Sequence, residues 1–427
     1  MRRLEGAAEN FLMINHNTPA SLWRNRNYLI LWGGQVVSSV GTQVSQLAFP
    51  LLVLMLTHSA AQAGFVGASR ALPYLLFSLP AGALIDRWDR KRVMMLCDAV
   101  RAVCLASIPL AFALGRLSIV QIYLVSLVEG TLFVFFDIAE TSCLPNVVER
   151  EQLPAAVAQN QATQGITSLL GPALGGFLYG VSLLLPFVAD AVSYVVSVLS
   201  LSWIRSNFQQ ERVVARRRLD QEVREGLVWF WRQPVLRVMA VLSCGVNLVV
   251  VGGTTLLVIV LAQHQHASSF TIGLIFACGG IGSIVGSLFA SYLQKKLKFG
   301  QAIISNLWVL ALLWPLYAIV PNVVTMGILT SALFFFGPIY NVVNASYRLA
   351  LVPDAFQGRV NSAVRLISFA SQPLGLAATG VLIQGVGAAA TVLVGAGVLI
   401  VVALVATMSS DVRNAGHAVP VASGVQG

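Results

Sequence analysis

Twelve long apolar stretches follow one another along the chain, separated by polar breaks that are mostly short. The hydrocarbon core of a membrane offers the backbone no water, so only helices and closed barrels cross it. About 20 apolar residues in a helix match the thickness of that core. The pattern predicts an all-α polytopic membrane protein whose twelve transmembrane helices lie at about 28–56, 63–85, 93–115, 118–143, 155–180, 184–204, 238–262, 271–293, 301–320, 323–347, 360–384 and 388–408.

The composition fits a chain that lies mostly in lipid. Hydrophobic residues make up 57% of the 427 residues and charged residues only 10%, whereas a soluble domain carries about 25% charged residues. This scarcity of charge excludes two or three soluble domains of the same total length. The net charge of +10 indicates anionic membrane lipid beside the spans rather than nucleic acid.

The positive charges alternate from break to break. All but five of the 27 Lys and Arg residues lie before the first span, after the last span or in breaks that follow even-numbered spans. The exceptions are Arg116, on the opposite side, and Arg70, Arg101, Arg348 and Arg365, within spans. Because positive charge stays cytoplasmic, we expect a multi-pass protein of the bacterial cytoplasmic (inner) membrane with both termini in the cytoplasm.

The longest break divides the spans six and six. Its segment RRRLDQEVREGLVWFWRQP combines charges with an apolar stripe, which favours an amphipathic helix on the inner membrane surface; a solvated linker is the alternative. The tail is small and polar, which predicts disorder. The expected organisation is a cytoplasmic N-terminal segment at 1–27, a six-helix bundle at 28–204, the linker at 205–237, a second six-helix bundle at 238–408 and a cytoplasmic tail at 409–427.

The two halves of the chain repeat weakly. Asn160 precedes Pro172 by twelve positions in the fifth span, and Asn361 precedes Pro373 by the same distance in the eleventh. The fourth and tenth spans correspond in a similar way. Repeated halves are how many transporters build a central site that opens alternately to each side. We therefore expect two pseudo-symmetric bundles with a site between them.

The break between the second and third spans reads Gly82-Ala-Leu-Ile-Asp86-Arg87-Trp-Asp89-Arg90-Lys91-Arg92. A glycine allows close helix contact, and a carboxylate can pair with a cation or a helix N-terminus. This pattern predicts a latch between the bundles on the cytoplasmic side, with a topology anchor as the alternative. The candidate latch residues are Gly82, Asp86, Arg87, Arg90 and Lys91. The loop resembles the signature of the major facilitator superfamily, except that Asp89 stands where many members have Gly.

The fifth span contains Gly171-Pro172-Ala-Leu-Gly175-Gly176. Small residues let helices approach closely and Pro172 bends the helix. The motif resembles the antiporter signature of the same superfamily, although kinked Gly/Pro spans are common in membranes. Asp98 with Arg101, and the segment from Val188 to Tyr194, resemble the branch of siderophore exporters and macrolide efflux proteins. The resemblance implies a twelve-helix secondary transporter that exports its cargo.

Charged side chains within spans are costly and usually functional. Glu129 lies near the middle of the fourth span at a depth similar to Arg70, while Asp137 lies nearer the inner end at a depth similar to Arg101. We hypothesise ion pairs between these residues. Burial disfavours the charged form of a carboxylate, so Glu129 is the leading proton-coupling candidate, followed by Asp137, Glu140, Arg70 and Arg101. A permanent structural pair is the alternative.

Asn341 and Asn344 are the candidate substrate contacts, because the tenth span corresponds to the fourth; interhelical hydrogen bonding is the alternative. The sequence contains no nucleotide-binding signature, and His264 and His266 form at most a weak two-ligand surface pair. The five cysteines have no paired spacing. No enzymatic activity, metal or cofactor is expected.

The sequence thus predicts a secondary active transporter that exports a small amphipathic molecule, such as a drug, macrolide or siderophore, in exchange for protons. We expect it to function as a monomer surrounded by membrane lipid, with no nucleic-acid partner. Proton-linked or facilitative uptake is one alternative. A transport-dead sensor or a membrane-embedded enzyme is another.

Overall fold

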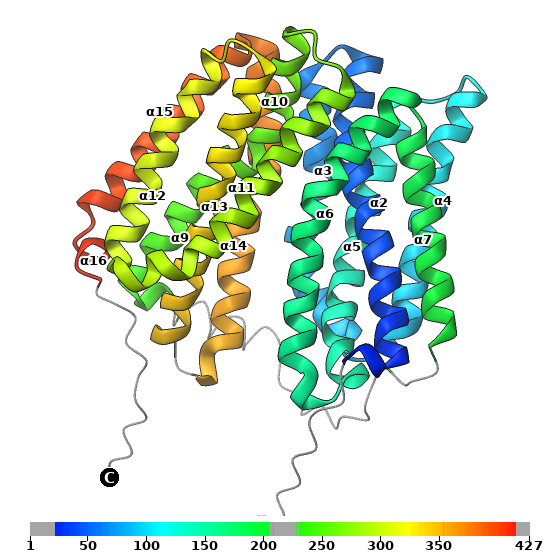
Figure 1. The fold of residues 1–427 in the computed structure, drawn as a ribbon, viewed down its shortest axis with the longest axis horizontal. Helices are drawn as coiled ribbons and strands as arrows, with labels where there is room; N and C mark the ends of the chain where they lie inside the picture. Colours follow the sequence, from blue (N-terminus) through cyan, green and yellow to red (C-terminus); the bar gives the residue numbers. More distant parts are fainter. Residues whose placement is uncertain (1–21, 205–207, 209–227, 229, 353, 416–427) are drawn as a thin grey trace, which may run out of the picture.

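Residues 22–204, 208, 228, 230–352 and 354–415 are described by the structure, a computed structural model. Every regular element in these residues is a helix (Figure 1). The first half of the chain forms η1 (Leu22–Arg24), α2 (Arg26–Thr57), α3 (Ala60–Ile85), α4 (Arg90–Ala113), α5 (Ile119–Val147), η2 (Arg150–Gln152), α6 (Leu153–Val181) and α7 (Leu185–Trp203).

The second half repeats this arrangement with two local interruptions, a π-helical turn (η3) and a 3₁₀ turn (η4). Its elements are α9 (Pro234–Val246), η3 (Asn247–Val251), α10 (Gly252–His264), α11 (Ser269–Lys296), α12 (Phe299–Leu313), η4 (Trp314–Ala318), α13 (Val323–Leu351), α14 (Asp354–Val386), α15 (Ala388–Met408) and α16 (Ser410–Arg413).

Twelve helical segments cross the molecule, which confirms the predicted fold class. Among the described residues, nine are long and apolar enough to span a membrane by length and hydropathy. The helices α3, α6 and α14, of 26, 29 and 33 residues, complete the set. Several helices extend past the predicted spans, since the polar residues at their ends continue the helix beyond the apolar stretch.

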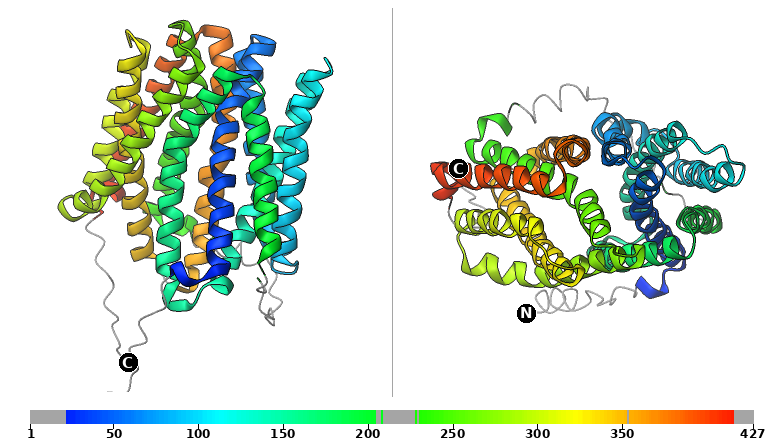
Figure 2. Two further views of the ribbon diagram at one scale, coloured as in Figure 1. Left: turned by 45° about the vertical axis from the view of Figure 1, so that its right-hand side comes forward. Right: turned by 90° about the horizontal axis from the view of Figure 1, so that it is seen from above.

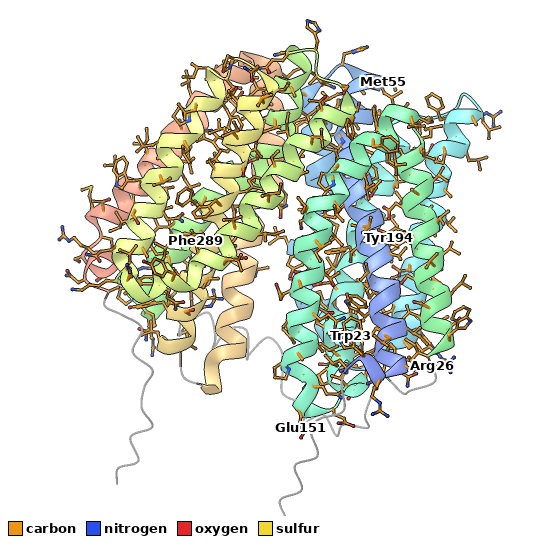
Figure 3. The ribbon with its side chains drawn as sticks, in the orientation of Figure 1. Trp23, Arg26, Met55, Glu151, Tyr194 and Phe289 are labelled. Atoms are coloured by element: carbon orange, nitrogen blue, oxygen red, sulfur yellow. The ribbon has the colours of Figure 1, made fainter. Side chains whose placement is uncertain are left out.

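The helices gather into two bundles, α2–α7 and α9–α15 (Figure 2). One end of the molecule carries Arg26, Glu151 and Lys298 and is called the basic end. The other carries Met55 and is called the opposite end; Figure 3 labels Arg26, Glu151 and Met55 at these two ends. Pro172 and Pro373 each lie 19 residues after the first residue of their helices, α6 and α14, so the predicted repeat is visible in the helices.

The bundles contact each other mainly through two helix pairs, α3 with α14 and α6 with α11, and helix α10 adds smaller contacts with α2 and α3. A Cβ atom at Gly64 would lie 2.9 Å from the Cα of Gly380, and one at Gly176 would lie 3.0 Å from the Cα of Gly273. These four glycines bring the backbones into direct contact near the opposite end. Toward the basic end the two bundles diverge (Figure 1).

The π-helical turn η3 lies against the middle of α14. A Cβ atom at Gly375 would lie 2.2 Å from the carbonyl oxygen of Leu248, so only glycine permits this approach. The same helix contacts α3 of the first bundle through Gly380. Helix α14 is therefore held between its own bundle and the other one.

Two predictions about the breaks meet the limits of the described residues. The proposed amphipathic helix in 205–237 lies largely outside them, although Phe230 of its apolar stripe is fully buried. The tail begins with an ordered helix, α16, rather than with a polar segment free of structure. Val412 is fully buried, and Gly300 N donates a hydrogen bond to Ala415 O at 3.4 Å; residues 416–427 lie outside the described residues.

Candidate functional site

A cavity of about 510 Å³ lies between the two bundles. Helices α2, α3, α5 and α6 supply most of its wall, and η3, α10 and α14 supply the part that belongs to the second bundle. Binding sites for drug-sized molecules have volumes of about 300–1,000 Å³. Aromatic and aliphatic side chains line it together with hydroxyl groups and with five charged or amide side chains: Gln46, Arg70, Asp137, Gln164 and Gln372.

An ion pair between α3 and α5 borders this cavity through its arginine. Arg70 Nε lies 2.5 Å from Glu129 Oε2, and Arg70 Nη2 donates to Glu129 Oε1 at 3.2 Å. The Arg70 side chain is 19% exposed and Glu129 is fully buried, so Arg70 faces the cavity and covers the carboxylate. The predicted Arg70–Glu129 pair is therefore present.

Local sequence explains why this pair forms. Gly130 follows Glu129 on α5, and a Cβ atom there would lie 2.0 Å from the carbonyl oxygen of Arg70. The missing side chain lets the backbone of α3 rest directly on α5 at the height of the ion pair. The pair is thus set by backbone contact as well as by charge.

A second arginine approaches Glu129 from behind. Arg101 Nη2 donates to Glu129 Oε1 at 2.8 Å, and its Nη1 donates to Asp98 Oδ1 at 3.3 Å. The Arg101 guanidinium also lies 4.0 Å from the centre of the Tyr194 ring, a cation–π contact. Glu129 is therefore held between two cations.

Tyr194 of α7, labelled within the first bundle in Figure 3, completes the buried network. Its hydroxyl donates to Glu129 Oε1 at 3.0 Å and lies 2.9 Å from Thr42 Oγ1. Because the tyrosine proton is directed at Glu129, Thr42 is the donor in the second bond. Thr42 itself lines the cavity, so the network reaches the cavity at Thr42 as well as at Arg70.

The expected pairing of Arg101 with Asp137 is wrong. The carboxylates that pair with Arg101 are Glu129 and Asp98. Counting residues from the helix ends gives the height of the backbone only, and the long arginine side chain carries its charge to a different level. Asp137 lies on the cavity wall, while Glu140 lies half-buried farther toward the basic end of α5.

The loop from Gly82 to Arg92 binds helix ends within the first bundle. Arg90 Nη1 donates to Ser142 O at 2.7 Å, and Lys91 Nζ donates to Ile204 O at 2.6 Å; cations are favourable at such carbonyl ends. Arg90 also pairs with the exposed Asp86 at 3.4 Å. Arg87 is exposed, and Gly82 has open space beside it.

Asp89, the departure from the usual loop signature, has a structural role. Its carboxylate accepts a hydrogen bond from Arg92 N at 3.1 Å and caps the N-terminus of α4. Aspartate is among the preferred residues at this position. The helix cap therefore replaces the turn that a glycine would permit.

The glycine motif of the fifth span serves two contacts. Gly171 lies against Gln43 and Gly175 lies against the backbone of Val44, both on α2 of the same bundle. Gly176 instead contacts α11 of the other bundle. Pro172 lies inside α6, and its carbonyl oxygen faces Gly273 of α11. One motif thus joins α6 to both bundles.

The proposed substrate contacts Asn341 and Asn344 are not among the residues that line the cavity. Asn344 Nδ2 donates to Ser243 Oγ at 3.4 Å, which supports the alternative role in holding helices together, and Asn341 is exposed. The second bundle lines the cavity with Thr255 and Gln372 instead. The sequence repeat between the fifth and eleventh spans could have pointed to Gln372, because this residue directly precedes Pro373, the proline that marks the repeat.

Two helical bundles around a central cavity are the architecture of a membrane transporter. A major facilitator superfamily model, described as a transmembrane secretion effector, matches residues 17–423. The chain belongs to this family of transporters, and it is not an enzyme.

Two curated relatives cover most of the chain. The multidrug efflux pump Tap of Mycolicibacterium fortuitum is 27% identical over 391 residues, covering 86% of this chain and 91% of that protein. Macrolide efflux protein A of Streptococcus pyogenes is 23% identical over 407 residues, covering 92% and 98%.

Solved structures share the fold. A bacterial homologue of the human lysosomal transporter Spinster, inward-facing and unoccupied, has a TM-score of 0.75 at 13% identity and covers 92% of this chain and 98% of its own. A bacterial homologue of the iron transporter ferroportin, inward-facing, has a TM-score of 0.71 at 17% identity and covers 91% and 99%. At these identities the likeness concerns the fold alone.

Proposed function

We propose that this protein exports small amphipathic molecules, such as drugs, macrolides or siderophores, in exchange for protons. The observation that carries the proposal is the cavity between the bundles, whose wall contains Arg70, the ion-pair partner of buried Glu129. A site for cargo and a site for protons therefore share one wall. The names of the relatives, a multidrug efflux pump and a macrolide efflux protein, support export.

The cavity wall suits a cargo with apolar and polar parts. Phe49 and Phe133 offer aromatic surface, while Gln372 and Asp137 offer polar groups on opposite bundles. An amphipathic molecule can bury its apolar part against the aromatic rings and direct its polar part toward the other side chains. Such a site recognises a class of molecules rather than one compound.

Alternating access follows from the contacts between the bundles. Positive residues are retained in the cytoplasm, so we place the basic end and both termini there. Cargo then enters from the cytoplasm, where the bundles diverge (Figure 1). Export requires the pairs α3–α14 and α6–α11 to separate near the opposite end while the basic end closes.

Proton coupling is proposed to act through Glu129. As long as Glu129 is charged, it holds Arg70 through two close contacts. Protonation removes the negative charge and releases Arg70. Because α3 carries both Arg70 and Gly64, this release acts on the helix that contacts the second bundle. Asp137 and Glu140, nearer the basic end, are proposed to pass protons between Glu129 and the cytoplasm.

The loop from Gly82 to Lys91 is proposed to act as a latch in the state in which the basic end is closed. In the present state, Arg90 and Lys91 hold the ends of α5 and α7. Closure at the basic end brings the second bundle toward this loop. Exposed Arg87 is then proposed to pair across the interface, and Asp86 to exchange its partner Arg90 for a cation of the second bundle.

We further propose that the protein functions as a monomer in the bacterial cytoplasmic membrane. Each chain contains a complete cavity between its own bundles, so a second copy is not needed to build the site. Reporter fusions at either end of the chain test the orientation: both should report from the cytoplasm. A fusion that reports from the outer face contradicts the proposed topology.

Transport is tested in liposomes that contain the purified protein, with ethidium and erythromycin as probes. An imposed proton gradient should drive accumulation of at least one probe against its concentration, and a protonophore should abolish it. Flux that is identical with and without the gradient rejects proton coupling. Absence of flux above protein-free liposomes for both probes rejects an export site of this class.

A further inference from the structure

A third buried carboxyl group lies beside the Glu129 network and has no counter-ion of its own. Asp190 of α7 is fully buried. Its Oδ1 accepts a hydrogen bond from Ser193 Oγ at 3.1 Å, and no hydrogen-bond partner of Oδ2 is found among the described residues. A charged carboxylate in this position would be buried in the membrane without a cation paired to it.

The surroundings of Asp190 confirm this isolation on each packed helix. On α2 it faces Gly41, where a Cβ atom would lie 2.6 Å from Asp190 Oδ1, and the uncharged Ser45. The charged groups nearby are Arg101 and Asp98 on α4, Glu129 on α5 and Arg70 on α3; Tyr194 is the titratable neighbour on α7 itself. Both arginines are already bound to Glu129.

The charges of this cluster balance without Asp190. Arg70 and Arg101 contribute two positive charges, and ionised Glu129 and Asp98 contribute two negative charges through their ion pairs. A fifth charge would leave the buried cluster with a net charge, which is costly in hydrocarbon. With Glu129 and Asp98 ionised in their ion pairs, the cluster is neutral when Asp190 carries a proton.

We propose that Asp190 is a buried carboxylic acid that donates its proton to Glu129 during transport and replaces it as counter-ion of the arginines. In this step the O–H bond of Asp190 breaks and an O–H bond forms on Glu129. One carboxylate replaces another, so the proton count and the charge of the cluster stay constant. The inference rests on the proposed proton coupling and adds a second acid to it.

Three hydroxyl groups, those of Tyr194, Thr42 and Ser45, lie between the two acids. The Tyr194 hydroxyl donates to Glu129 and lies 2.9 Å from Thr42 Oγ1. Ser45, one turn beyond Thr42 on α2, donates to Thr42 O at 3.1 Å and faces Asp190. Hydroxyl groups both donate and accept. The proposed route therefore requires Ser45 to turn from the carbonyl oxygen of Thr42 toward the Thr42 hydroxyl.

The test is infrared spectroscopy of the protein in liposomes at neutral pH, with carbon-13-labelled aspartate to assign the protonated carboxyl band. The wild type should show an aspartic acid band that Asp190→Asn removes. Glu129→Gln should also remove it, because Asp190 then ionises to balance the arginines. Arg70→Gln should keep the band, because it removes a positive charge. The exposed-site control Asp411→Asn should match the wild type.

Two results overturn the proposal: a wild type without a band assignable to Asp190, or a band that persists in folded Glu129→Gln protein. If Glu129→Gln does not fold, the wild type, Asp190→Asn and Arg70→Gln still decide whether Asp190 is protonated in a charge-balanced cluster. The infrared bands do not depend on flux. Absence of gradient-driven transport in liposomes would therefore contradict the proposed function, while the bands would still show whether Asp190 is protonated.

Discussion

The two bundles share one fold but differ in what they bury. Among the side chains that the structure describes, the fully buried charged ones are Asp98, Arg101, Glu129 and Asp190, and all four belong to the first bundle. The interior of the second bundle is joined by neutral hydrogen bonds, such as Ser243 with Tyr340 and Tyr317 with Thr330, both at 2.8 Å.

In the proposed mechanism, this difference gives the two bundles different tasks, although their folds are related by pseudo-symmetry. One task is to bind protons, and the other is to supply a neutral part of the cavity wall. Neutral hydrogen bonds do not respond to proton concentration near neutral pH, whereas a buried ion pair changes when its carboxylate takes a proton. In the proposed mechanism, the first bundle is therefore the half that binds protons. The second supplies cavity wall through Thr255 and Gln372 and the surface against which the first bundle moves.

The largest expected effect separates the bundles by function. Glu129→Gln should reduce gradient-driven export by about 100-fold or more, since one pair partner removed from a buried site costs about 3–5 kcal/mol. Ser243→Ala, in the second bundle, should stay within about twofold. Uptake of ethidium into liposomes measures both. Wild-type export by Glu129→Gln would remove this residue from the mechanism.

Stability should show the same contrast. Arg101→Met leaves Glu129 and Asp98 with one cation fewer in a buried site, and we expect a loss of about 3–5 kcal/mol in the free energy of unfolding. Tyr317→Phe, which removes a neutral hydrogen bond, should cost about 1 kcal/mol. Denaturant unfolding in detergent measures the difference. Equal losses would show that burial alone, and not charge, distinguishes the bundles.

A matched pair of glycines sharpens the comparison. A Cβ atom at Gly130 would lie 2.0 Å from Arg70 O, and one at Gly286 would lie 2.0 Å from Phe335 O. Alanine at either position should cost about 1–3 kcal/mol through overpacking. Only Gly130→Ala moves Arg70, so export should fall in that variant alone. A similar fall in export in both glycine variants would show that overpacking, and not the displacement of Arg70, causes the defect.

The smallest expected effect on stability concerns the N-terminal caps of two corresponding helices, α4 in the first bundle and α12 in the second. Asp89→Ala removes the side-chain cap of α4 and should cost about 1 kcal/mol of stability. Lys298 precedes the corresponding helix α12, and a lysine side chain cannot accept the cap hydrogen bond. Lys298→Ala should therefore be nearly neutral in the same unfolding experiment. A loss there of similar size would exclude capping as the cause.

The sequence was sufficient for the twelve spans and for the Arg70–Glu129 pair, because apolar length and charge placement act through the membrane itself. It did not predict that Arg101 would bind Asp98 and Glu129, since helix periodicity gives the face of a residue but not the reach of its side chain. The buried roles of Tyr194 and Asp190 depend on how α7 packs against α2.

The cavity wall of the second bundle was harder to predict. The correspondence between α13 and α5 predicts Asn341 and Asn344 as substrate contacts, yet a correspondence between helices does not fix which residues face the centre. Thr255 and Gln372 face it instead. Thr255 follows the π-helical turn at 247–251, a local change of pitch that the hydrophobic pattern does not record.

That turn fixes the rotational register of everything after it. A π-helical turn accommodates one more residue than an α-helical one, and one residue corresponds to about 100° of rotation. Deleting a single residue from 247–251 would restore uniform pitch and swing Thr255 and Leu256 away from the cavity. One inserted residue thus determines which face of a whole half-helix the cargo meets.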